Sequence, residues 1–236
     1  MAAFFAKTLD GFLTPAFLEQ VCKKYHYAEE QLPELQAAAG EMLSLMREEA
    51  FWESKMVFPK KPCRTEAPDA EFAYVVMSLG KGIDRLQESY SEKGLLTQSY
   101  MIEVLASELL LKGYDAYNRY VRKSTELHVA RYHFPGSEEA FPLEMLPKLL
   151  GELTRDVACN SAFCMVPKKS VAFVSELTRD ENLCCQGICV GCGNLYCPNR
   201  VTDDDSVRKR LAGAADMPLT YGYSRIFGID NSVRPY

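Results

Sequence analysis

The chain has 236 residues and a formal charge of −5, from 27 Lys and Arg against 32 Asp and Glu. Its 47% hydrophobic and 25% charged residues are ordinary for a globular protein, which excludes a disordered, collagen-like or coiled-coil chain. The acidic balance argues against a nucleic-acid-binding domain, and no apolar run approaches the ~18 residues that span a bilayer. We therefore expect neither a nucleic-acid partner nor a membrane.

Residues 1–58 are predicted to form a helical N-terminal segment. A short amphipathic stretch covers 17–25, and apolar residues recur at helical spacing between Glu29 and Trp52. Three prolines between residues 59 and 68 then predict an exposed linker. The first fourteen residues lack a long apolar run with a small-residue cleavage site, so we interpret them as mature protein.

Residues 70–180 are predicted to form the main domain, in which strands and helices alternate. The predicted strands cover 72–79, 126–133, 162–166 and 171–177, and the predicted helices lie around 83–90, 97–123 and 143–153. Thr97 is the expected N-cap of the long helix, and Gly113 in its middle predicts a close approach to a neighbouring element. A hairpin turning at 167–170 is expected to join the last two strands. Lys168 and Lys169 at its tip are expected to be solvated.

Five of the nine cysteines fall within fourteen residues: Cys184, Cys185, Cys189, Cys192 and Cys197. A secreted disulfide protein would be short and would carry an even number of cysteines. This chain is long and has an odd number, so the cluster predicts a metal site in a cytoplasmic protein. Residues 184–200 are therefore a predicted metal-binding loop, followed by a tail over 201–236 without assignable structure.

Four thiolates, from Cys185, Cys189, Cys192 and Cys197, suit one metal centre. A [4Fe–4S] cluster often takes its ligands from one compact run that ends in Cys-Pro, as this run does. Zinc also takes four thiolates, typically from two separated pairs, and free or redox-active thiols are a third reading. Cys184 is an alternative ligand. The spacing of the first three ligands also matches the radical S-adenosylmethionine signature, but too little chain follows it for that enzyme's barrel.

Isolated polar residues give weaker signals. Arg131 has the chemistry to hold a carboxylate through two hydrogen bonds, although a surface arginine at a strand end is an equally good reading. His133 lies close to it in sequence, just before the turn predicted at Pro135 and Gly136. The remaining histidines are isolated, and no phosphate-binding glycine loop or serine-hydrolase motif is present.

Four ordered segments together resemble one family. They are 75–84 (VVMSLGKGID), 131–136 (RYHFPG), 141–144 (FPLE) and 165–171 (MVPKKSV). In this order they resemble the activation domain of cobalamin-dependent methionine synthase, and most closely its free-standing short relatives from anaerobic bacteria. Those relatives end in a cysteine-rich loop that finishes Cys-Pro-x-Arg, as Cys197–Arg200 does here. The similarity covers residues 70 to 200.

The resemblance implies an α+β fold, in which a twisted, mainly antiparallel sheet packs against long helices. It implies a domain that binds S-adenosylmethionine and docks over a corrinoid, with Arg131, Pro135 and Gly136 at the cofactor-binding positions. The sequence differs from the family pattern in having one more residue between arginine and Pro-Gly, and Ser137 where the family has tyrosine. Asn118–Arg119 occupies the place of the family's acidic S-adenosylmethionine ligand.

Residues and resemblance together predict reductive activation of a Co(II) corrinoid on a partner protein, such as methionine synthase, within methionine biosynthesis. The cysteine loop would carry the electron and S-adenosylmethionine would be a further ligand. Two other hypotheses stay open. One is a non-catalytic subunit that binds a corrinoid protein and carries structural zinc, and the other is a general iron–sulfur electron-transfer or redox-sensing protein.

Overall fold

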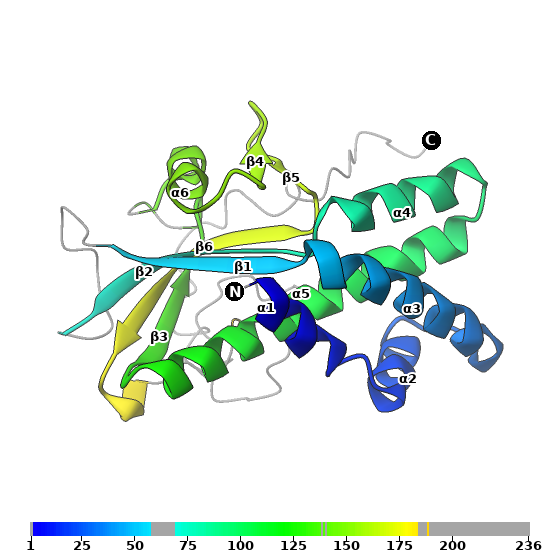
Figure 1. Ribbon diagram of the computed structural model, residues 1–236, viewed down its shortest axis with the longest axis horizontal. Coiled ribbons are helices and arrows are strands. Elements are labelled where there is room, and N and C mark those ends of the chain that lie inside the picture. Colours follow the sequence, from blue (N-terminus) through cyan, green and yellow to red (C-terminus); the bar gives the residue numbers. More distant parts are fainter. Residues whose placement is uncertain (1, 58–68, 138, 140, 184–187, 189–236) are drawn as a thin grey trace, which may run out of the picture.

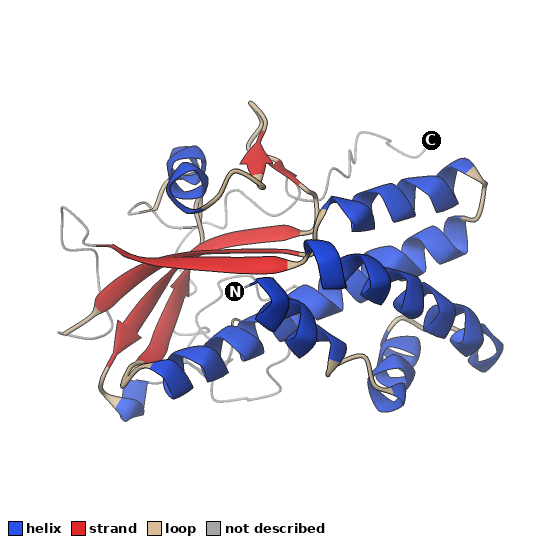
Figure 2. Cartoon of the chain, viewed as in Figure 1, coloured by secondary structure: helices blue, strands red, loops and turns tan. Residues whose placement is uncertain are grey.

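The computed structural model describes residues 2–57, 69–137, 139, 141–183 and 188. They form an α+β protein built on a four-stranded antiparallel sheet with helices on both of its faces (Figures 1 and 2). This is the fold class that the sequence predicts. The predicted linker at 59–68, the cysteine loop apart from Ile188, and the tail at 201–236 lie outside the described residues.

The elements follow one another with short connections. The helices are α1 (Ala2–Asp10), α2 (Pro15–Lys24), α3 (Leu32–Glu49), α4 (Lys81–Glu92), α5 (Leu96–Ser124) and α6 (Leu146–Leu153). Three single 3₁₀ turns are η1 (Glu29–Gln31), η2 (Leu143–Met145) and η3 (Glu181–Leu183). The strands are β1 (Phe51–Val57), β2 (Glu71–Ser78), β3 (His128–His133), β4 (Ala158–Cys159), β5 (Met165–Val166) and β6 (Ser170–Thr178).

The sheet has the strand order β1-β2-β6-β3, and every neighbouring pair is antiparallel. The two central strands, β2 and β6, are buried along almost their whole length, which explains why both read as nearly continuous apolar runs. The edge strand β3 contains a β-bulge, because Ala130 is an extra residue between Val129, opposite Leu177, and Arg131, opposite Glu176. β4 and β5 form a separate two-stranded ribbon.

The larger core lies between one face of the sheet and the helices α1, α3 and α5, which occupy the same side in Figure 1. Trp52 from β1 is its largest fully buried side chain and stacks on Phe5 of α1, with ring centroids 5.4 Å apart. α5 lies close to the sheet at Gly113, since a Cβ there would lie 3.1 Å from the Met77 sulfur. The close approach predicted for this glycine is confirmed.

The opposite face of the sheet is covered by α6 alone among the described helices (Figure 1). Its three buried leucines, Leu146, Leu149 and Leu150, pack against alternate residues of the central strands, with Phe141 completing this smaller core. Side chains of a strand alternate between faces, so each strand feeds both cores. The sheet is therefore a buried middle layer with a thick helical layer on one side and a thin one on the other.

The helix predicted from Glu29 to Trp52 ends earlier, at Glu49, and residues 51–57 form β1. Trp52 lies outside the apolar stripe of the helix, whose last member is Met46, and it suits a strand because aromatic residues favour half-buried sheet positions. Seven residues of β1 pair with β2, and that pairing decides the outcome. The N-terminal helices then pack into the same core as the sheet.

The prediction that Thr97 caps the long helix is wrong. The N-cap is Leu95, which provides no side-chain hydrogen bond. The turn between α4 and α5 sets where α5 begins. Gly94 in this turn has a φ of +74°, and the Leu95 N–H donates to the Tyr90 carbonyl at 2.9 Å. This six-residue hydrogen bond with a left-handed glycine ends α4, and α5 starts directly from it.

The predicted hairpin between 162–166 and 171–177 is also wrong. β5 pairs with β4, whereas β6 enters the main sheet between β2 and β3. The backbone of the connecting residues bonds elsewhere: the Lys168 N–H donates to the Asp84 carboxylate at 2.7 Å, and the Lys169 carbonyl accepts from the Leu79 N–H at 2.9 Å. These bonds direct the chain away from β5 and into the sheet.

Candidate functional site

The four predicted metal ligands Cys185, Cys189, Cys192 and Cys197, with the alternative ligand Cys184, lie outside the described residues. What the structure describes is the chain on either side of the first of them. The turn η3, at 181–183, folds back against β3, with the His128 imidazole 3.8 Å from the Glu181 carboxylate. Ile188 immediately precedes Cys189 in the sequence and packs, partly buried, against the larger core. The described turn before the cysteine segment is thus attached to β3, and Ile188 within the segment is attached to the larger core.

Arg131 lies on β3, on the face of the sheet that α6 covers. Its partner residue across the ladder is Glu176 of β6, and His133 follows two positions later on the same face. The His133 ring lies 4.9 Å from the Phe141 ring and 6.3 Å from the Phe72 ring, centroid to centroid. Cationic and titratable groups are therefore brought together beneath α6, at the edge of the smaller core.

His133 and Glu176 form a buried polar pair at the centre of this cluster. The His133 Nε2 atom lies 3.0 Å from the Glu176 Oε2 atom, and both side chains are fully shielded from solvent. Burial of a carboxyl group is unfavourable unless it is hydrogen-bonded, so this contact helps to hold Glu176 at its position. The two residues connect β3 to β6 next to Arg131 and fix the local geometry of the strand that carries it.

The predicted Pro135–Gly136 turn directly follows β3. The Ser137 N–H donates to the Phe134 carbonyl at 2.9 Å, closing a four-residue turn in which Gly136 has a φ of +84°. A residue with a side chain would be strained there, and its Cβ would lie 3.3 Å from the Leu143 Cβ atom. The Gly136 N–H also donates to the Phe141 carbonyl at 2.7 Å, so the turn is held against the start of the α6 layer.

The structure does not bring Arg131 together with Asn118, the residue at the place of the family's acidic ligand. Asn118 lies on α5, on the other side of the sheet, where its Oδ1 atom accepts a hydrogen bond of 2.9 Å from the Tyr132 hydroxyl. Neighbouring residues of a strand face opposite ways, so Tyr132 points toward α5 and Arg131 points toward α6. The described cofactor-binding candidates are therefore Arg131, Pro135 and Gly136 alone.

A second polar cluster lies where the 167–170 segment meets α4 and α5. Lys169, expected to be solvated, is buried and forms an ion pair with Glu103, while its Nζ atom also lies 3.3 Å from the Ser107 hydroxyl. Lys168 does remain exposed, in an ion pair with Glu88 at 3.1 Å. Burial raises the pKa of the nearby Asp84 carboxyl, an effect that the hydrogen bond from the Lys168 backbone only partly offsets.

Sequence reasoning singled out His133 but missed Glu176 and the Lys169–Glu103 pair. Glu176 could have been found as a charged residue inside the mainly apolar predicted strand Val171–Leu177. A carboxyl group in such a strand is rarely buried without a partner. The signal for Lys169 is weaker, because two adjacent lysines next to a proline look like a solvated turn. Only the tertiary position of α5 reveals its partner.

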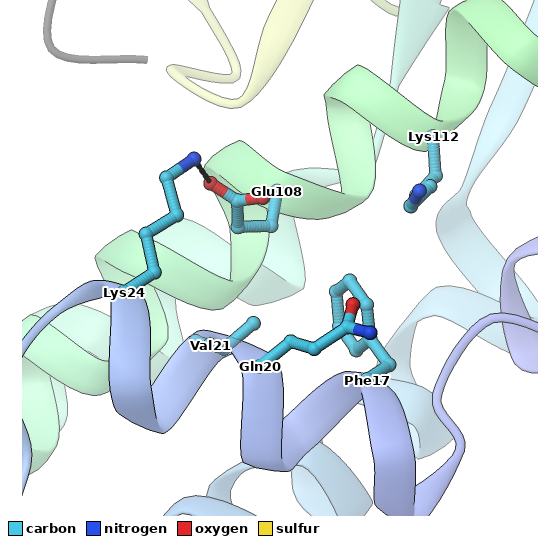
Figure 3. Close-up of a pocket in the computed structure, with 6 residues that line it drawn as sticks. All are labelled: Phe17, Gln20, Val21, Lys24, Glu108 and Lys112. Carbon is cyan, nitrogen blue, oxygen red and sulfur yellow. Dashed lines mark hydrogen bonds and ion pairs between the residues drawn. The ribbon is translucent and has the colours of Figure 1, made fainter. Parts of the chain in front are cut away.

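Among the described residues, no group of three or more His, Cys, Asp or Glu side chains is arranged to hold a metal ion. The described cysteines are Cys22, Cys159 and Cys164, and all three are free thiols. A small hollow of about 110 Å³ lies between α2 and α5 (Figure 3). Both of its cations already have acidic partners, Lys24 with Glu108 at 2.6 Å and Lys112 with Asp115 at 3.8 Å, so this hollow offers little to a charged ligand.

No protein-family model matches the chain, and a search of curated proteins finds no match. Within the described part of the chain, no helix is long and apolar enough to cross a membrane.

Proposed function

We propose that this protein supports the reductive activation of a corrinoid protein, such as cobalamin-dependent methionine synthase, with an iron–sulfur cluster bound in residues 184–200. The supporting observation is that the turn which immediately precedes the cysteine segment in sequence contacts the strand that carries Arg131. β3, which carries Arg131, is contacted by η3, and η3 is separated from Cys184 by no intervening residue. The α+β fold with an antiparallel sheet is also what the family resemblance implies.

The donor set fits a thiolate-bound cluster. On this proposal Cys185, Cys189, Cys192 and Cys197 are its ligands, and the proline after Cys197 follows the compact pattern of iron–sulfur segments. When bound there, a [4Fe–4S] cluster supplies one electron at low potential, which is the chemistry that a Co(II) corrinoid on a partner protein requires before it accepts a methyl group.

The described residues have binding roles in this proposal. Arg131 holds the carboxylate of S-adenosylmethionine, because a guanidinium forms two parallel hydrogen bonds with a carboxylate. Pro135 and Gly136 form the part of the surface that approaches the corrinoid, and Gly136 is exposed at the tip of its turn. The buried His133–Glu176 pair positions β3, which joins Arg131 to the Pro135–Gly136 turn, and does not contact the ligand.

One observation favours a second candidate, a non-catalytic corrinoid-protein-binding subunit with structural zinc. Asn118 replaces the family's acidic ligand and is engaged by the Tyr132 hydroxyl on the far side of the sheet from Arg131. An S-adenosylmethionine site of the family type would then be incomplete, while docking on a corrinoid protein would be retained.

Anaerobic purification followed by iron, zinc and acid-labile sulfide analysis separates the two candidates. We expect iron, sulfide and a visible absorption that dithionite bleaches, all lost in Cys192→Ser and in Cys197→Ser. The control is Cys164→Ser, which removes an exposed free thiol outside the cysteine segment and should leave metal content unchanged. The reduced protein is then added to a Co(II) methionine synthase, and recovery of methyl transfer is measured.

Full reactivation by a variant without the cluster would refute the electron-transfer role. Zinc with a featureless visible spectrum would favour the binding subunit, and association with the corrinoid protein in a pull-down would then be expected to persist. A cluster without any effect on corrinoid proteins would instead favour a general electron-transfer protein.

A further inference from the structure

A cavity of about 460 Å³ opens between α1 and the C-terminal half of α5. Its lining residues are Thr8, Ala116, Arg119, Tyr120, Lys123 and Ser124. This volume lies within the range of small-molecule sites, which are typically a few hundred to a thousand Å³. None of these residues belongs to the proposed corrinoid function.

The floor of the cavity is apolar. Ala116 is 2% exposed, and its short side chain leaves the space that a larger residue would fill. Tyr120, one turn further along α5, is half-buried and contacts the Trp52 ring edge to face, with centroids 5.2 Å apart. The aromatic packing underneath fixes Tyr120, so the floor is rigid on the side of the main core.

The rim of the cavity is cationic. Arg119 and Lys123 are exposed and four residues apart on α5, so their side chains lie on one face of the helix. Neither forms an ion pair with a carboxylate of the described residues, unlike Lys24 at the smaller hollow. The Arg119 guanidinium carbon lies 5.1 Å from the centre of the Phe12 ring, a cation–π contact that holds the charge near the opening.

We propose that this cavity binds a small organic anion, whose planar apolar body lies over Ala116 and Tyr120 and whose anionic group is bound by Arg119 and Lys123. A chain with a net charge of −5 repels anions in general, so two adjacent cations over an apolar floor, without an acidic partner among the described residues, form a local exception. The anionic group is a carboxylate or a phosphate, since guanidinium and ammonium groups bind both.

The fluorescent probe 1-anilinonaphthalene-8-sulfonate, a planar organic anion, tests this proposal in the full-length protein. It is titrated into the unmodified protein and displaced by benzoate, phenyl phosphate, inorganic phosphate or neutral benzamide. Benzoate and phenyl phosphate distinguish the two anionic groups. The test variant is Arg119→Gln/Lys123→Gln, and the control is Lys93→Gln/Lys148→Gln, which removes two exposed cations elsewhere.

We expect the dissociation constant of the better aromatic anion to rise about tenfold or more in the Arg119→Gln/Lys123→Gln protein, because two charge-assisted hydrogen bonds are lost. In the control it should change less than twofold. Equal affinity in both variants, or absence of displacement by either aromatic anion, would overturn the proposal. Displacement by benzamide or inorganic phosphate as strong as by the aromatic anions would overturn it as well, because charge and apolar body must act together.

Discussion

The buried His133–Glu176 pair makes a strong prediction for stability. The Nε2–Oε2 distance is 3.0 Å and neither side chain is exposed, so His133→Leu would leave the Glu176 carboxylate in the smaller core without this partner. Removing the hydrogen-bond partner of a buried acceptor typically costs about 1–3 kcal/mol, because the remaining group keeps its desolvation penalty. We therefore expect His133→Leu to lower the free energy of unfolding by about 1–3 kcal/mol.

Urea denaturation at pH 7, followed by circular dichroism and Trp52 fluorescence, measures this loss. The matched control is His128→Leu on the same strand, where the ring lies 3.8 Å from a carboxylate whose side chain is 84% exposed. A contact with an exposed carboxylate contributes at most about 1 kcal/mol, so the free energy of unfolding of the His128→Leu control should change little. The slope of free energy against urea should stay constant in both variants, which shows that the denatured state is unaffected.

The reasoning would be refuted if His133→Leu cost less than about 1 kcal/mol, or no more than the control does. Glu176→Gln provides an internal check, since the amide retains a polar atom for His133 and carries no charge. It should cost less than His133→Leu, and a larger loss would show that the carboxylate is held mainly by other neighbours.

Three further predictions concern single positions. Burial raises the pKa of Asp84 above its ordinary 3.8. The contribution of this carboxyl to stability is therefore complete below pH 3.8 and is lost as the pH rises through the raised pKa. Asp84→Asn should raise the melting temperature at pH 7 but not at pH 3. A melting temperature at pH 7 below that of the unmodified protein would contradict this. Gly80 has a φ of +91° and a Cβ there would lie 2.3 Å from the Glu49 Cβ, so Gly80→Ala should destabilise by about 2–4 kcal/mol in chemical denaturation. Gly94→Ala, with a φ of +74° but no atom within 4 Å of the new Cβ, should cost only about 1–2 kcal/mol, and equal losses would show that contact with Glu49 is irrelevant. Thr14 caps α2 by accepting the Phe17 N–H at 3.2 Å, so Thr14→Ala should cost about 1 kcal/mol in the same assay, and no loss at all would disprove the cap.

The apolar periods of the chain were sufficient to predict α2 to α6 and the two central strands, whereas α1 was covered only by the general expectation of a helical N-terminal segment. The α5 pattern spans several turns, and the run at 72–79 is too apolar and β-branched for any other buried element. Prediction failed where two structures suit the same residues locally. Residues 51–57 follow the helix without a proline or glycine between them, and the pairing with β2, in which Trp52 lies opposite Met77, determines that they form a strand.

The candidate site could be predicted in part. A turn at Pro135 and Gly136 follows from residue type alone, because Gly136 adopts the positive φ that this turn requires. The contact between His133 and Glu176 does not, since the two are 43 residues apart and are joined only by the pairing of β3 with β6. The cysteine ligands remain a prediction from spacing.

The bulge at Ala130 has a consequence for how errors in strand pairing are avoided. Val129 faces the large apolar core, and in a regular strand Arg131 and His133 would face it too, because residues two apart share a side. The extra residue reverses this alternation and places both on the α6 side, opposite Glu176 and Val174. A slip of β3 by one residue would therefore force a guanidinium and an imidazole between α5 and the sheet, among aromatic rings. The edge strand thus has one permitted alignment, which is enforced by the two side chains that the proposed site depends on.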